Sequence, residues 1–94
     1  MTTREFPALL QAFFTERLLQ QRCASPHTVT AYRNSFRLLL RFATDRLGRS
    51  PSELLVADLD AALIGEFLLH LEHDRGNSPR TRNARLAAIH AFFR

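Results

Sequence analysis

Two near-identical tetrads are the places in this chain where residue types and spacing could do chemistry. Residues 25–28 are Ser-Pro-His-Thr and residues 78–81 are Ser-Pro-Arg-Thr, so both follow the pattern Ser-Pro-x-Thr. The serine hydroxyl can accept a hydrogen bond from a first-turn N–H, and the proline after it has a suitable φ and no N–H to leave unpaired. Each tetrad therefore predicts a helix N-terminus, whose positive dipole end, edged by threonine and arginine, suits a phosphate group. Capping explains the tetrads with or without such a ligand.

Arginine is the second chemical signal, because all thirteen basic residues are arginine, against nine acidic residues and a net charge of +4. The guanidinium fork suits bidentate contacts to phosphate and guanine, although a GC-rich genome would also produce this bias. On a helix after the first tetrad, a row about 110 to 120° round from the apolar side consists of Thr30, Arg33, Arg37 and Arg41. Such a row is often an ordinary solvated face. The matching group at the second tetrad consists of Arg80 and Thr81 within it and of Arg82, Ala84 and Arg85 after it.

Helices must position these residues, because apolar residues recur at helical spacing and no strand alternation persists. The pattern predicts helices over about residues 7–22, 26–47, 59–73 and 79–94. Gly48 offers a stop for the second helix, the capping box at residues 50–53 belongs to a connector, and Asp58 or Asp60 caps the third helix. Four apolar faces with short connections predict one all-α, four-helix bundle over residues 1–94.

The last predicted helix carries large side chains on one face and small ones on the other. We expect Leu86, Ile89, Phe92 and Phe93 to face the core. A smooth opposite side, which would let a partner approach closely, consists of Ala84, Ala87, Ala88 and Ala91. Because the helical pattern has no stop by Arg94, we expect the chain to continue in a longer parent protein.

Other classes of function find little support. No paired carboxylates, glycine-rich phosphate loop or nucleophile-base set is present, so no catalytic residue, cofactor or small-molecule substrate is expected. Glu66, His70 and His73 share a helix face, but without a cysteine partner or second motif they predict no metal site. No apolar run approaches the roughly 18 to 20 residues of a membrane span, and no signal peptide is evident, so we expect no membrane partner and a cytoplasmic location. The one cysteine, Cys23, excludes an internal disulfide.

Several short sequence segments, taken in their order along the chain, form one combined pattern. They are the apolar run from Leu9 to Leu19, the first tetrad with Ala31-Tyr32-Arg33, then Asp58-Leu59 and Phe67-Leu68, and the second tetrad leading to Arg85-Leu86 and Phe92-Phe93. Together they resemble the N-terminal core-binding domain of the tyrosine recombinase (phage integrase) superfamily, a SAM-like four-helix unit. In that family the domain is half of a C-shaped clamp on duplex DNA, with its second and fourth helices near the major groove. The resemblance implies duplex DNA and other recombinase protomers as partners.

The resemblance also carries DNA-facing residues onto the two helices: Thr28, Arg33 and Arg37 on the second, and Arg80, Thr81 and Ala84 on the fourth. From their chemistry we expect Arg33, Arg37 and Arg82 to neutralise phosphates. Thr28 and Thr81 would hydrogen-bond to phosphate oxygens, and Arg80 would be placed to contact a base edge. Thr30, Arg41 and Arg85 complete the expected patch. We expect both helix starts and both arginine rows to share one exterior.

The family's catalysis does not transfer to this chain. Its active site lies in a following domain, and its His-x-x-Arg spacing occurs at none of the four histidines here. Tyr32, the single tyrosine, lies in a predicted core stripe and is not expected to be a nucleophile.

Two alternatives remain open. A helix-turn-helix regulator needs a turn of three or four residues, which the ten-residue connector between the second and third helices fits poorly. A protein interaction module is the other, because helical bundles of this kind can bind proteins and the apolar last turn could dock a partner.

Overall fold

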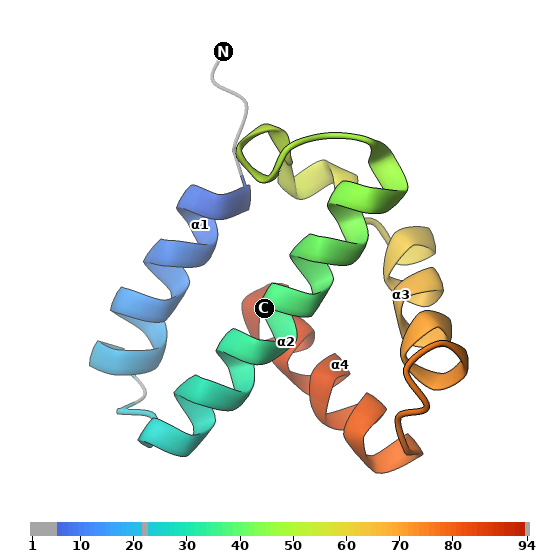
Figure 1. Cartoon of the computed structure of the whole chain (residues 1–94). Helices are drawn as coiled ribbons and strands as arrows, with labels where there is room; N and C mark the ends of the chain where they lie inside the picture. Colours follow the sequence, from blue (N-terminus) through green and yellow to red (C-terminus); the bar gives the residue numbers. More distant parts are fainter. Residues whose placement is uncertain (1–5, 22, 94) are drawn as a thin grey trace.

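The computed structural model describes residues 6–21 and 23–93, without the side chains of residues 19–21, and these residues form an all-α fold (Figure 1). The first helix, α1 (Phe6–Ala12), runs on into the π-helical segment η1 (Phe13–Gln21). It is followed by α2 (Pro26–Leu47), the short 3₁₀ turns η2 (Pro51–Glu53) and η3 (Val56–Asp58), α3 (Ala61–His73) and α4 (Pro79–Phe93). The predicted fold class is confirmed.

Both Ser-Pro-x-Thr tetrads are helix caps, as the sequence predicts. Ser25 Oγ accepts a hydrogen bond from the Thr28 N–H at 3.2 Å, and Ser78 Oγ accepts one from the Thr81 N–H at 3.2 Å. At its other end α2 stops at Gly48, whose φ of 66° is left-handed and costs glycine little.

Two helix boundaries differ from the sequence expectation. The third helix begins at Ala61 rather than at residue 59, because Asp60 is the residue that caps it, by accepting a bond from the Leu63 N–H at 2.9 Å. The first predicted helix is α-helical only as far as Ala12, and from Phe13 it widens to π geometry, which local apolar spacing does not signal. η1 closes with the Ala24 N–H on the Leu18 carbonyl at 2.8 Å.

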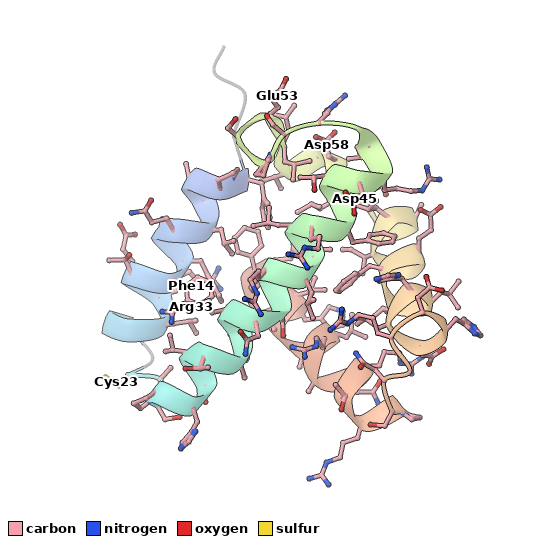
Figure 2. The ribbon with its side chains drawn as sticks, in the orientation of Figure 1. Phe14, Cys23, Arg33, Asp45, Glu53 and Asp58 are labelled. Atoms are coloured by element: carbon pink, nitrogen blue, oxygen red, sulfur yellow. The ribbon has the colours of Figure 1, made fainter. Side chains whose placement is uncertain are left out.

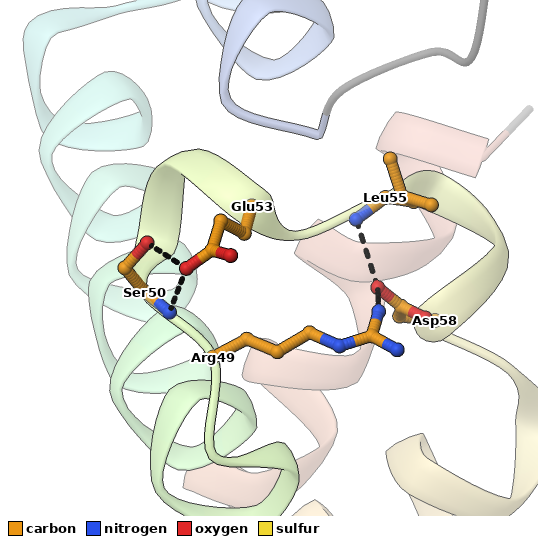
Figure 3. Close-up of polar contacts among 5 residues, drawn as sticks. All are labelled: Arg49, Ser50, Glu53, Leu55 and Asp58. Atoms are coloured by element: carbon orange, nitrogen blue, oxygen red, sulfur yellow. Dashed lines mark hydrogen bonds and ion pairs between the residues drawn. The ribbon is translucent and has the colours of Figure 1, made fainter.

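The connector between α2 and α3 is held by its own polar side chains (Figure 3). Glu53 Oε1 accepts hydrogen bonds from the Ser50 hydroxyl at 2.6 Å and the Ser50 N–H at 3.2 Å. Asp58 Oδ2 accepts from Arg49 at 2.9 Å and from the Leu55 N–H at 2.9 Å. Leu54 between them is fully buried, and its carbonyl accepts a bond from the Phe6 N–H, which anchors the start of α1.

Aromatic rings join the first and last helices in the core. The Phe92 ring lies 5.4 Å from those of both Phe6 and Phe13 and 5.6 Å from that of Phe36, in edge-on arrangements that favour ring pairs. Besides Phe6 of α1 and Phe36 of α2, the large side chains that are fully or almost fully buried come from η1, α2, the connector, α3 and α4: Leu18, Leu39, Leu54, Phe67, Leu71 and Ile89.

The expected core face of α4 was partly wrong. Ala88 and Ala91, assigned to the outer side, are 0% and 6% exposed, whereas Phe93, assigned to the core, is 42% exposed. Helix α4 packs against both α2 and α3 (Figure 1), so its small side chains allow close approach of backbones inside the bundle. Ala84 and Ala87 stay exposed.

Candidate nucleic-acid interface

The starts of α2 and α4 border a common groove of about 590 Å³. Helix α2 contributes one wall through His27, Thr28, Ala31, Tyr32 and Ser35, and α4 contributes the other through Arg80, Thr81, Ala84 and Arg85. None of these lining residues is acidic. Two capped N-termini and two guanidiniums therefore meet at one concave surface, which favours an anionic ligand.

Threonine hydroxyls edge this groove at both helix starts. Thr28 Oγ1 lies 3.1 Å from Ser25 Oγ, and Thr81 Oγ1 accepts from Ser78 Oγ at 3.2 Å. Each serine is thus occupied by capping, while each threonine hydroxyl keeps further hydrogen-bonding capacity. The two tetrads place matching polar groups on opposite walls.

Arg85 lies partly buried between the two walls. Its Nη1 donates to Ser35 Oγ at 3.2 Å, and Ser35 itself is 3% exposed and donates to the Ala31 carbonyl at 2.9 Å. Burial, and secondarily the positive charge of Arg75, lowers the pKa of Arg85. Arg85 Nε is buried without a hydrogen-bond partner among the described residues. A partly desolvated cation with no facing carboxylate would be stabilised by a bound anion.

The structure divides the predicted site residues between surfaces. It brings Thr28, Arg80, Thr81, Ala84 and Arg85 together in the groove. Arg33 and Arg37 instead line a separate groove between α1 and α2, where Figure 2 shows Arg33 beside Phe14. Thr30 lies with Arg33 in a small hollow near Pro26, and Arg41 is exposed outside both grooves.

The side chain of Arg82 contacts α3 rather than α2. Its Nη1 forms an ion pair with Glu72 Oε1 of α3 at 2.7 Å. The expectation that both arginine rows share one exterior is therefore not met. The reason is the helical twist of α2, which turns successive side chains by about 100° per residue. Positions 28, 31, 32 and 35 therefore face α4, whereas positions 33 and 37 face α1.

Four lining residues escaped the sequence prediction: His27, Ala31, Tyr32 and Ser35. Tyr32 was assigned to the core, but it is only partly buried, and its ring stacks on Phe13 with centroids 6.5 Å apart and planes 8° apart. A signal was present, because Ala31, Tyr32 and Ser35 follow Thr28 at helical spacing.

Two of the three α3 side chains that share a face, Glu66 and His70, are engaged with other partners. Glu66 accepts from Arg46 at 2.8 Å, and His70 Nδ1 lies 2.8 Å from Asp74 Oδ2. Within residues 6–21 and 23–93, no three His, Cys, Asp or Glu residues are grouped so as to hold a metal ion. In the same ranges no helix has the length and hydropathy needed to cross a bilayer.

Comparison with known proteins gives one family and two relatives. Residues 11–94 match the family of the phage integrase N-terminal SAM-like domain. A candidate integrase/recombinase, y4rC of Sinorhizobium fredii (strain NBRC 101917 / NGR234), is 56% identical over 86 residues, which is 92% of this chain and 26% of the relative. A second from the same strain, y4rD, is 48% identical over 85 residues, or 90% of this chain and 30% of the relative. The chain thus spans under a third of either relative, and no solved structure matches it.

Proposed function

The chain belongs to the family of phage integrase N-terminal SAM-like domains, and from that membership we propose that it is the DNA-holding core-binding domain of a site-specific tyrosine recombinase. The observation that carries the proposal is the groove in which the capped starts of α2 and α4 meet Arg80 and Arg85. Phosphate oxygens are the anions that such a surface would meet along a duplex.

The groove residues have distinct roles in this proposal. Thr28 and Thr81 donate hydrogen bonds to phosphate oxygens at the two helix starts, where the dipoles add to the attraction. Arg85 supplies a fixed positive charge, because Ser35 holds its guanidinium at 3.2 Å. Arg80 is exposed and free to reach a base edge, and Ala84 next to it lets the backbone of DNA approach closely.

The remaining predicted residues stand further from this contact. Thr30, Arg33, Arg37 and Arg41 lie beyond the groove on α2, and Arg82 is paired with Glu72. We therefore propose the groove set as the primary DNA contact and expect these five to contribute less.

The proposal extends to the longer protein. Strand cleavage and joining would belong to a catalytic domain after this one, and other recombinase protomers would be its partners on DNA. The cell compartment would then be the cytoplasm, where chromosomal DNA is accessible to the enzyme.

Binding of the 94-residue chain to a fluorescent duplex tests the proposal. We expect weak binding whose log K falls by about 0.9 per phosphate contact against log salt, with roughly three to six contacts. Arg80→Gln should weaken binding and relax any preference among duplex sequences. Arg41→Gln is the control, since it removes the same charge outside the groove. Absence of binding to any duplex at low salt would contradict the proposal.

A further inference from the structure

A second groove of about 410 Å³ lies between α1 and α2, away from the proposed DNA contact. Its floor consists of the buried Leu10 and Phe36, and its walls include the partly buried Pro7, Phe14 and Leu40. Each helix supplies residues at i, i+3, i+4 and i+7, so the walls run parallel to the helix axes for two turns. A groove of this shape can bind another helix along its length.

Two arginines line this apolar groove on its α2 side. Arg33 and Arg37 are exposed, and within the described residues neither forms an ion pair or a hydrogen bond. Arg46, Arg49 and Arg82 pair with carboxylates, whereas Arg41, Arg75 and Arg80 form no ion pair among the described residues. Arg33 and Arg37 differ from those other unpaired arginines because both line an apolar groove. The groove therefore combines apolar surface, which a partner could bury, with positive charge that no carboxylate among the described residues neutralises.

We propose that the α1/α2 groove docks an acidic amphipathic helix of a protein partner. Leucine or phenylalanine side chains of that helix would cover Pro7, Phe14 and Leu40, and its glutamates would meet Arg33 and Arg37. Duplex DNA complements this surface less well, because it offers phosphates but no apolar groups of matching shape. The charge and the apolar surface together select the partner's chemistry.

A pair of designed peptides tests the proposal on the 94-residue chain. Both are helical and carry leucine at i and i+4, one with glutamates flanking the leucines and the other with lysines in their place. We expect the acidic peptide to bind at least about tenfold tighter, which corresponds to about 1.4 kcal/mol, as measured by calorimetry. Amide chemical shift changes should centre on residues 7–14 and 33–40.

Variants sharpen the assignment. Arg33→Glu with Arg37→Glu should reverse the preference, so that the lysine peptide binds tighter than the glutamate one. Arg41→Glu is the matched control on the same helix and should leave the preference unchanged. Arg33→Gln with Arg37→Gln, which should abolish the preference, serves if the reversed variant does not fold.

Two results would overturn the proposal. One is equal binding of both peptides, or shift changes that lie elsewhere. The other is a loss of duplex affinity in the Arg33→Gln, Arg37→Gln variant as large as that in Arg80→Gln, which would assign these arginines to DNA. Because the duplex test of Arg80 addresses the other groove, either proposal can fail while the other stands.

Discussion

Arg17 holds the end of α4 through the backbone carbonyl of Phe92, 75 residues later in the chain. Its Nη1 donates to that oxygen at 3.0 Å, and its Nη2 donates to the Ala91 carbonyl at 3.0 Å. The last carbonyls of a helix have no partner inside the helix, and a cation there also complements the dipole. The same guanidinium lies over the Phe13 ring, 5.1 Å from its centroid. One side chain thus joins η1 to α4.

Replacing Arg17 by methionine should therefore destabilise the domain. The variant loses two charge-assisted hydrogen bonds and leaves two carbonyls to water, for about 1 to 2 kcal/mol of unfolding free energy. Chemical denaturation measures the change. Arg41→Met, at an exposed arginine without such partners, should stay within about 0.5 kcal/mol of the parent. Equal losses in both variants would show that the contact does not stabilise the fold.

Two glycines should respond in opposite directions to alanine. Gly48 has a φ of 66°, so Gly48→Ala should cost about 1 to 2 kcal/mol through strain, although the added Cβ meets nothing within 4 Å. Gly65 lies inside α3 with open space at its Cβ position, so Gly65→Ala should stabilise by about 0.5 to 1 kcal/mol. Thermal unfolding of the pair decides, and a shift of the same sign in both would refute the conformational argument.

Overpacking should distinguish the two sides of α4. Ala88 is 0% exposed, so Ala88→Leu should cost about 1 to 3 kcal/mol by forcing its neighbours apart. Ala87→Leu adds the same atoms at an exposed position and should change stability little. The measurement is the denaturation midpoint, and a tolerated Ala88→Leu would contradict the close packing of α4.

Acid should weaken the fold through two glutamates. Hydrogen bonding from Arg46 lowers the pKa of Glu66, and the Ser50 hydroxyl followed by its N–H lowers the pKa of Glu53. Because both carboxyls bind protons less readily in the folded chain, their contribution is present above the pKa of the unfolded chain. It is lost as the pH falls through the lowered folded value.

Glu66→Gln should flatten this acid dependence of the unfolding free energy, measured by denaturation at a series of pH values below neutrality. In a chain already carrying Arg46→Gln, the same substitution should have almost no further effect. An unchanged pH profile in Glu66→Gln would show that the Arg46 contact is absent in solution.

Arg80 and Arg85 should differ in how they affect DNA recognition. Arg80→Ala should relax any sequence preference, since an exposed guanidinium at the groove can reach base edges. Arg85→Ala should weaken all duplexes alike, because its guanidinium is held by Ser35 as a positioned charge. A panel of duplexes titrated at constant salt measures both, and a uniform loss in Arg80→Ala would remove it from base readout.

The sequence alone predicted the structural features that depend on residues close together along the chain. The two tetrads predicted the starts of α2 and α4, and Gly48 predicted the end of α2, because capping bonds span only a few residues. Apolar periodicity predicted four helices and an all-α fold for the same reason. The order of the pieces was enough to indicate the family that residues 11–94 match.

Contacts between distant segments were decided by the tertiary structure alone. Periodicity reports which side of a helix is apolar, but not how far the helix is rotated against each neighbour. That rotation buried Ala88 while exposing Phe93, turned Tyr32 into the α2/α4 groove and left Arg33 and Arg37 beside α1. The bond of Arg17 to Phe92 likewise joins residues whose proximity no local spacing encodes, because only the closed bundle brings η1 to the end of α4.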